Sequence, residues 1–474
     1  MFCGVCLRAI ADIAAPLLIA GTLASSCVHY VAKPIGPTEP LTTIEGRSPD
    51  DARLRDFLAA HDGGLPQPSR WSLRSLTLLA FYYHPALDEA RAAADVARGA
   101  IITAGAKPNP TAQATIGYDT TTPPPWMPGF GLLIPIETAG KRGHRIEEAT
   151  RRAEAARLQI IATAWQVRVG VRRSLLEVVI ARRQELLLTR QLAVQDTIVE
   201  LFQRQLEAGA ITPFDATQAR LAVATTRLAV NQAGVQRALA EAALADALGL
   251  TRESFSAIAP SVDVGDELNV QLSEPVVRRQ ALVSRSDVRA ALAEYEASQA
   301  SLQLEIARQY PDIELGPGYL FDQTDNKWTL AAGVTLPIRN RNQGPIAEAT
   351  ARREQAAAHV MVVQANALHE LSEAEAVLQA ARLKLTTAEA ALTTTQEQAQ
   401  RRQRMYDAGD ISRVELLTAQ LETASAEVAV GEARAQVDRA AGALEDAIQS
   451  PLGIEDAVLT NPRKTESTPE RQQP

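Results

Sequence analysis

The sequence predicts a mainly α-helical protein with a small β part, in which long antiparallel coiled-coil helices carry four short strands. Only 4% of the 474 residues are aromatic, and long stretches consist of Ala, Leu, Val, Glu, Gln and Arg, most of which are strong helix formers. The order of helices, strands and turns occurs twice along the chain. Each occurrence contains two segments in which apolar and polar residues alternate, as in half-exposed strands.

The amino terminus has the order of features that marks an exported lipoprotein. Arg8 precedes a largely apolar run from Ile13 to Leu23, and small residues then lead to Cys27. We expect residues 1–26 to be a cleaved signal peptide and Cys27 to carry a lipid anchor that includes palmitate. The alternative is an ordinary signal peptide followed by an incidental cysteine, and the protein is exported in either case.

The chain repeats itself with a period of about two hundred residues, and this duplication defines the expected domains. Gly117-Tyr118 in the first copy corresponds to Gly318-Tyr319 in the second, and a very long helical stretch follows in each. The expected domains are the lipoprotein signal at 1–26, a lipid anchor and linker at 27–70, a first repeat (helix, two strands, helix, helix) at 71–250, a connection at 251–285, a second repeat at 286–450 and a disordered tail at 451–474.

The alternating segments are typical of transmembrane strands that turn one face to lipid and the other to a lumen. Hairpin turns are expected at residues 120–126 and 322–326. No later segment has the ~20 uninterrupted apolar residues that a membrane-spanning helix needs. The expected apolar face consists of Ala112, Ala114, Ile116 and Tyr118, then Phe130, Leu132, Ile134 and Ile136, then Ile313, Leu315, Tyr319 and Phe321, and finally Trp328, Leu330, Ala332, Val334, Leu336 and Ile338.

Four such strands are too few to enclose a useful pore. Because lipid offers no hydrogen bonds, strands can cross it only in a closed barrel, so one chain must associate with others. The alternative is a pair of edge hairpins on a soluble sheet, flanked by structural coiled coil.

Each long helical stretch is interrupted by a short turn that its local sequence explains. A glycine can end one helix in the left-handed conformation, a hydroxyl residue can cap the next, and an acid three residues later completes a capping box. Apolar positions such as Val194, Ile198 and Leu201 suit closely packed coiled coils, although the core face of a soluble bundle has the same pattern. The residues of these tips are Gly209, Thr212 and Asp215 in the first repeat and Gly409, Ser412 and Glu415 in the second.

Several function classes are excluded by composition and motifs. The formal charge is -8, and Lys and Arg are dispersed among acids, so the basic patch of a nucleic-acid-binding protein is not expected. No nucleotide-binding loop, Gly-x-Ser-x-Gly or His-Glu-x-x-His motif occurs, and the six histidines are scattered. We therefore expect no enzyme activity, no catalytic residue, no cofactor and no metal site.

The second alternating segment runs into Pro135-Ile136-Glu137-Thr138-Ala139-Gly140-Lys141-Arg142. With the duplication and the paired tips, this motif resembles the TolC family of outer-membrane efflux factors, and within it the branch that serves cobalt-zinc-cadmium efflux of the RND type. The resemblance covers about residues 70 to 450. It implies a homotrimer that combines a twelve-stranded β-barrel in the outer membrane with an α-barrel in the periplasm.

The same resemblance implies a passive exit duct for heavy metals or drugs, fed by a periplasmic adaptor protein and an inner-membrane transporter, with the barrel in contact with outer-membrane lipid. At the periplasmic tips it assigns Asp215 and Tyr406 to latching contacts and Glu415 to an acidic ring. Arg413 can substitute for a latch arginine, because Ile411 stands at the usual position, and Thr418 stands where a second ring acid would be.

The strand-to-helix junctions must redirect the chain sharply, which suits proline and glycine. We expect Lys141 and Arg142 to face solvent or lipid headgroups there. The junction residues are Pro135, Gly140, Gly143, Pro337 and Gly344.

Two other protein classes share some of these features. A periplasmic adaptor is also exported and has a long helical hairpin, but it has one hairpin flanked by soluble β-domains, whereas this chain has two hairpins with strand pairs at their opposite ends. A coiled-coil scaffold without a pore is the third possibility.

Overall fold

The computed structural model describes residues 30–61, 71–121, 123–256, 258, 279, 282–322 and 324–449. The chain forms two units, Met1–Gly46 and Arg47–Pro474. In the first unit, the described residues contain the short helix α2 (Glu39–Glu45). The predicted signal peptide, the lipidation site Cys27, most of the predicted connection 251–285 and the predicted tail 451–474 lie outside the described residues.

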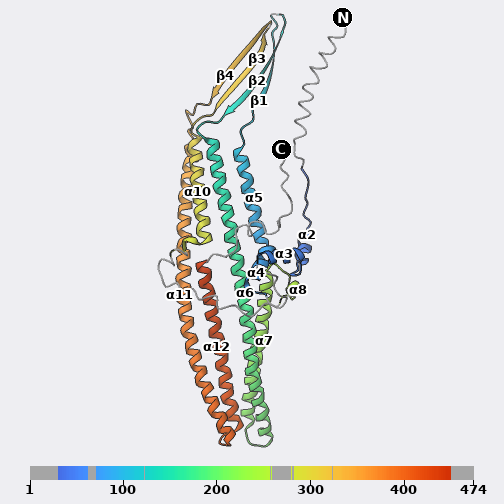
Figure 1. Ribbon diagram of the computed structural model, residues 1–474, viewed down its shortest axis with the longest axis vertical. Coiled ribbons are helices and arrows are strands. Elements are labelled where there is room, and N and C mark those ends of the chain that lie inside the picture. The colour runs from blue at the N-terminus through green and yellow to red at the C-terminus, as the bar shows by residue number, and fades with distance from the viewer. Residues whose placement is uncertain are drawn as a thin grey trace. The chain divides into compact units, whose positions relative to one another are not determined.

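The second unit combines long helices with one four-stranded sheet, which confirms the predicted fold class (Figure 1). The sheet lies at one end of the long helices, and both helix-turn-helix tips lie at the other. No helix in the described ranges is both long enough and apolar enough to cross a membrane. The elements are α3 (Ala52–His61), α4 (Leu73–Tyr83), α5 (Pro85–Gly105), β1 (Thr111–Tyr118), β2 (Trp126–Ile136), α6 (Lys141–Glu207), α7 (Pro213–Ala247), α8 (Arg252–Phe255), α10 (Ser286–Ala307), β3 (Ile313–Asp322), β4 (Asp325–Val334), α11 (Gln343–Ala408) and α12 (Arg413–Ile448).

The long helices form a single open layer. Toward the tips, α7 packs on α6, α6 on α12, and α12 on α11. Toward the sheet, α5 packs on α6, α6 on α10, and α10 on α11. Among the described elements, α11 packs mainly on α10 and α12, and α5 and α7 pack mainly on α6, so the layer has two uncovered edges.

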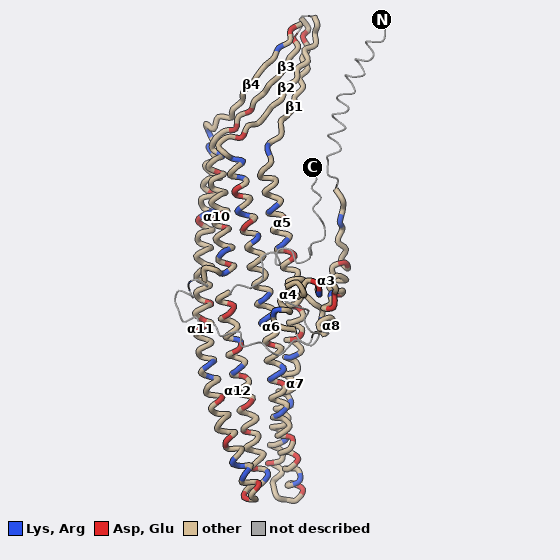
Figure 2. The backbone as a smooth tube through the Cα atoms, viewed as in Figure 1, with Lys and Arg blue, Asp and Glu red and all other residues tan. Residues whose placement is uncertain are grey.

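The two central helices run the length of this layer. α6 has 67 residues and α11 has 66, which at 1.5 Å per residue makes each of them about 100 Å long. Their partners bury mainly alanine: α10 buries Ala290, Ala293, Ala297 and Ala300. Small side chains let neighbouring helix axes approach closely along the whole contact. Figure 2 shows that Lys and Arg are interspersed with Asp and Glu along these helices.

The sheet is antiparallel with the order β1-β2-β3-β4. Its register places Ala114 opposite Phe130, Phe130 opposite Tyr319, and Tyr319 opposite Trp328. Directly paired residues point to the same side of a sheet, so the alternating apolar residues of all four strands share one face. The prediction was wrong at one end: β4 stops at Val334, so Leu336 and Ile338 lie beyond the strand.

The opposite face of the sheet carries all of the glycines of its strands, and we call it the small-residue face. Gly318 lies so close to its neighbour that an added Cβ would meet Thr329 Oγ1 at 2.8 Å. An added Cβ on Gly316 would meet the Leu133 side chain at 3.2 Å. The glycines on this face thus leave space that the larger side chains of Met127, Leu133 and Leu320 cover. Its glycines are Gly117, Gly129, Gly131, Gly316, Gly318 and Gly333.

Part of the region predicted as lipid anchor and linker, residues 27–70, folds onto the helices. Leu54, Phe57 and Leu58 of α3 are buried in the largest hydrophobic core, together with side chains of α4, α6 and α7. Their spacing of three and four residues is the pattern of a short helix that buries one face. The prolines and polar residues around this short helix obscure that pattern in the sequence.

A buried ion-pair cluster joins the two repeats where α6 meets α12. Arg172 is 4% exposed and donates from Nη2 to Asp446 Oδ2 at 2.6 Å and to the carbonyl of Gly442 at 2.8 Å. Arg168 pairs with Glu445 at 2.5 Å in the same cluster. Burial raises the pKa of Asp446, and Arg172 offsets this rise only in part. The first and second repeats are therefore held together by a guanidinium that is almost fully withdrawn from water.

Gly442 provides the space for this guanidinium. A Cβ at residue 442 would lie 1.8 Å from Arg172 Nη1, whereas a Cβ at Gly170, two residues before Arg172 on α6, would meet nothing within 4 Å. We expect Gly442→Ala to displace the guanidinium and cost about 3 kcal/mol, as is typical when a buried ion pair is broken. Gly170→Ala is the matched control and should be neutral or stabilise the helix by up to ~1 kcal/mol.

The measurement is the thermal unfolding midpoint of the two purified variants in detergent. Equal midpoints for Gly442→Ala and Gly170→Ala would show that the Arg172 cluster contributes nothing to holding α12 on α6.

Candidate functional site

The two helix tips are built by the same local interactions. The N–H of Ala210 donates to the carbonyl of Gln205, and the N–H of Asp410 donates to that of Met405. Gly209 and Gly409 occupy the left-handed conformation, with φ of 70° and 83°. These contacts close each helix in the Schellman arrangement and reverse the chain within a few residues.

The next helix at each tip begins with a reciprocal capping box. Thr212 Oγ1 accepts from the N–H of Asp215 at 3.3 Å, and Asp215 Oδ2 accepts from the N–H of Thr212 at 3.1 Å. Ser412 and Glu415 make the same pair of bonds at 3.3 and 2.8 Å. Each acid therefore satisfies backbone groups that a helix start leaves free.

These bonds also set the protonation of the two acids. The hydroxyl and N–H of Thr212 lower the pKa of Asp215, and the N–H and hydroxyl of Ser412 lower the pKa of Glu415. A lowered pKa means that the folded tip binds a proton less readily than the unfolded chain. The capping contribution is therefore complete near neutral pH and is lost as the pH falls through the lowered pKa values.

The predicted latch residues are placed at the tips but are not joined within one chain. Tyr406 is 37% exposed near the end of α11, and Arg413 is the first residue of α12. In the described part of the chain, no hydrogen bond or ion pair connects Asp215 with Tyr406, Arg413 or Glu415. Glu415 instead lies 3.8 Å from Arg402, a partner that the sequence comparison of the two tips did not reveal.

The first strand-to-helix junction is tied to the second repeat. Lys141 is 8% exposed and donates from Nζ to Asp312 Oδ1 at 2.7 Å, and the N–H of Thr138 donates to the same oxygen at 2.9 Å. The expectation that Lys141 faces solvent or headgroups was wrong, because its ammonium pairs with the carboxylate of Asp312, the residue that precedes β3. Arg142 is exposed and donates to the carbonyl of Gly105 at 2.7 Å.

The junction turns are made by Gly140 and Asn342, which precede α6 and α11 with φ of 68° and 64°. Asn342 also donates from its side chain to the carbonyl and carboxylate of Glu305, both at 2.8 Å. Gly143 and Gly344 lie inside α6 and α11, Pro135 lies in β2, and Pro337 follows β4. Aligning the repeats at Pro135 and Pro337 would have revealed Asn342, because it then falls on Gly140.

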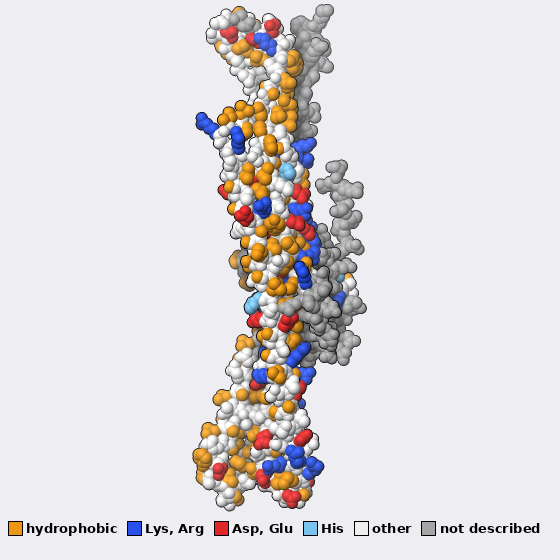
Figure 3. Space-filling view, turned by 90° about the vertical axis from the view of Figure 1, so that its left-hand side faces the viewer, with side chains coloured by type: hydrophobic (Ala, Val, Ile, Leu, Met, Phe, Trp, Pro, Cys, Tyr) orange, Lys and Arg blue, Asp and Glu red, His pale blue; other side chains and the backbone are white. Residues whose placement is uncertain are grey.

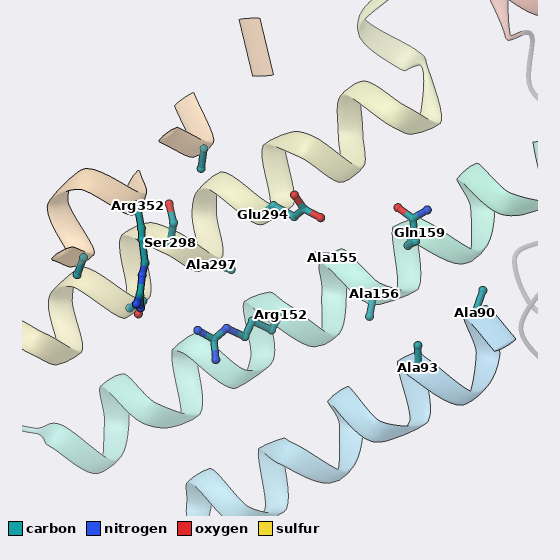
Figure 4. Close-up of a pocket in the computed structure, with 13 residues that line it drawn as sticks. Ala90, Ala93, Arg152, Ala155, Ala156, Gln159, Glu294, Ala297, Ser298 and Arg352 are labelled. Atoms are coloured by element: carbon teal, nitrogen blue, oxygen red, sulfur yellow. The ribbon is translucent and has the colours of Figure 1, made fainter. Parts of the chain in front are cut away.

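A groove of about 490 Å³ lies between α5, α6, α10 and α11 (Figure 4). Its walls are mostly alanine methyl groups, with Arg152, Glu294 and Arg352 as the charged residues. Arg152 and Arg352 pair with Glu148 and Glu348 on their own helices. The lining residues include no histidine or cysteine, and the described residues hold no cluster of metal-binding side chains.

Acid should loosen both tips. We expect amide exchange of the tip peptides, corrected for its intrinsic pH dependence, to rise as the pH falls below the ordinary carboxyl pKa values of 3.8 and 4.5. Near neutral pH, Ser412→Ala should raise exchange at the second tip roughly fivefold by removing the cap. Thr418→Ala removes a hydroxyl that bonds only to the carbonyl of Val414 and is the matched control. Hydrogen-exchange mass spectrometry gives the answer, and equal protection in the two variants would rule out a role for the cap.

Comparisons with known proteins agree with this architecture. The chain matches the family described as "Outer membrane efflux protein" twice, over residues 79–250 and 277–448. It is 28% identical over 264 residues to the cobalt-zinc-cadmium resistance protein CzcC of Cupriavidus metallidurans. That alignment covers 55% of this chain and 62% of the relative.

Solved structures share the fold. The outer membrane protein VceC of Vibrio cholerae superposes with a TM-score of 0.65 at 21% identity, covering 79% of this chain and 95% of that one. The CmeC outer membrane channel of Campylobacter jejuni gives 0.64 at 15% identity, covering 89% and 93%. The resemblance predicted from the sequence is confirmed, and so is the expectation of a transport protein rather than an enzyme. Because the two matched segments make up more than half of the chain, the protein belongs to the outer membrane efflux protein family.

Proposed function

We propose that this chain is one protomer of a trimeric exit duct in the outer membrane. It passively carries substrates that a periplasmic adaptor and an inner-membrane transporter deliver. The observation that supports this proposal best is that every layer of the second unit is open at both edges. The layers therefore become complete only when further copies join them.

The helical layer has apolar side chains along both of its edges. On α7, the exposed residues Phe214, Leu221, Leu228 and Val235 recur every seven positions and are 52% to 69% exposed. A seven-residue repeat is the pattern of a coiled-coil seam, so a second seam on α7 predicts another helix beside it. On α11, the opposite edge, the exposed apolar residues are Met361, Leu368, Val377 and Leu383.

The sheet is open on the same two sides. β1 and β4 are its edge strands, so each leaves a row of backbone N–H and C=O groups unpaired. β1 adjoins α5, and β4 adjoins α11. The side of α11 and β4 faces the viewer in Figure 3, and hydrophobic side chains cover much of it. In the proposed assembly, the edge formed by β4 and α11 of one copy contacts the edge formed by β1, α5 and α7 of the next copy. This head-to-tail contact recurs from copy to copy and closes into a ring.

The faces of the sheet suit a membrane position for that ring. Its apolar face would meet lipid, and its small-residue face would line the lumen. Three copies with four strands each give a closed barrel of twelve strands. In such a barrel every strand has a partner on both sides, so no backbone N–H or C=O of a strand edge is left without a hydrogen bond in lipid. The number three rests on the family resemblance.

The lipid anchor, the cargo and the transporter partner belong to the same proposal. Cys27 anchors the protomer through a lipid that includes palmitate. Metal cations are the proposed cargo, because the relative from Cupriavidus metallidurans is named for cobalt-zinc-cadmium resistance, and drugs are the alternative. The transporter partner is then of the RND type. The sharp turns of the strand-to-helix junctions are the proposed role of Pro135, Gly143, Pro337 and Gly344.

We place the gate at the tips, where Asp215, Tyr406 and Arg413 of neighbouring copies approach each other and Glu415 forms an acidic ring. Three Glu415 carboxylates around one axis would favour cations. Glu415→Lys should therefore reduce the cation selectivity of the channel in planar bilayers. Glu253→Gln, on the exposed surface of α8, is the control. Unchanged selectivity in Glu415→Lys would remove the ring from the proposal.

Assembly is tested by charging one seam. Leu228 is 69% exposed on the α7 edge, so Leu228→Glu should place a charge in the contact between copies and abolish the detergent-resistant trimer. Leu186 is 51% exposed on α6, which has neighbours on both sides in the layer, so Leu186→Glu should leave the trimer intact. Size-exclusion chromatography with light scattering on outer-membrane extracts measures both.

A monomeric, water-soluble wild-type product would contradict the proposed function and favour a periplasmic adaptor. Trimers that give no conductance in a bilayer would favour a coiled-coil scaffold.

A further inference from the structure

One carboxylate stands apart on the small-residue face of the sheet. Glu314 is the second residue of β3, at the end of the sheet that joins the helices. It is paired with Pro135 on β2 and Gly333 on β4, so the three residues point to the same face. Ile313 and Leu315 on either side of it point to the apolar face.

The surroundings of Glu314 leave its charge exposed and uncompensated. Its side chain is exposed, and a Cβ added to Gly333 would lie 3.8 Å from Glu314 Oε2, so the glycine leaves the space over which the carboxylate extends. No hydrogen bond or ion pair of Glu314 occurs in the described part of the chain. The nearby cations have other partners: Lys141 pairs with Asp312, and Arg145 pairs with Glu137.

The other charges of this face lie at the hairpin end of β3 and β4. Lys327 pairs with Asp322 at 2.5 Å, and Asp325 stands beside them. Between that group and Glu314, the described residues of the face are uncharged on all four strands. The face therefore has an excess of negative charge at each end, and Glu314 alone supplies it at the end nearest the helices.

We propose that Glu314 forms a second anionic ring, separate from the tips, which makes the strand section of the duct selective for cations. This inference rests on the proposed trimeric duct, in which the small-residue face lines the lumen. Three copies would place three unpaired carboxylates around the axis where the lumen passes from helices to strands. Rings of acidic side chains select cations in this way in other channels. By contrast, the carboxylate of Glu415 accepts hydrogen bonds from the N–H and hydroxyl of Ser412 in the capping box, and it lies near Arg402.

The test is the reversal potential of the full-length trimer in planar bilayers under a KCl gradient. Glu314→Gln keeps the shape of the side chain, and we expect the K⁺ to Cl⁻ permeability ratio to fall roughly two- to fivefold near 0.1 M salt, where charges act over about 10 Å. The difference should shrink at about 1 M salt, where screening is stronger. Glu253→Gln on α8 removes a carboxylate away from the sheet and should leave the ratio unchanged.

A second variant moves the charge instead of removing it. Gln113 is exposed on the same face of β1, opposite Gly131, so Glu314→Gln with Gln113→Glu should restore most of the selectivity. A wild-type ratio in Glu314→Gln, with conductance retained, would overturn the ring and leave the proposed duct standing. The absence of conductance in the unmodified trimer would overturn both.

Discussion

The open edges of the sheet and of the helical layer are the constraint on which the rest of the structure depends. A backbone N–H or C=O that faces lipid has no solvent to bond with, so β1 and β4 can persist in a bilayer only if another strand pairs with each. The edges of the helical layer are also uncovered, because α7 and α11 expose apolar side chains there. Both layers of one chain therefore have open edges that association with further copies would cover.

The two repeats are fastened to each other at two levels. At the sheet, Lys141 and Thr138 of the first repeat bind Asp312 of the second. Farther toward the tips, Arg172 binds Asp446 across α6 and α12. Buried ion pairs contribute little net stability compared with apolar packing, but they are costly to break singly. They therefore suit positions where the relative placement of two helices must not vary.

The two faces of the sheet divide its tasks. One face carries the glycines, such as Gly316 and Gly318, while aromatic side chains such as Phe130 and Trp328 extend from the other. Glu314 is exposed on the small-residue face, while its neighbours Ile313 and Leu315 lie on the apolar face. The transport chemistry proposed for this protein needs no reactive group. The proposed duct needs only a lumen, charged side chains that favour cations and an end that can close.

The sequence by itself determined the fold class, the duplication, the four strands and both tip turns, because these follow from local patterns: two-residue alternation, helical spacing and the capping of Gly209, Thr212, Gly409 and Ser412. Only the tertiary structure decided the partners of Lys141 and Arg172. Lys141 was misjudged as exposed because its partner, Asp312, lies 171 positions away. Such pairings are set by which helices and strands become neighbours, and no local pattern records that.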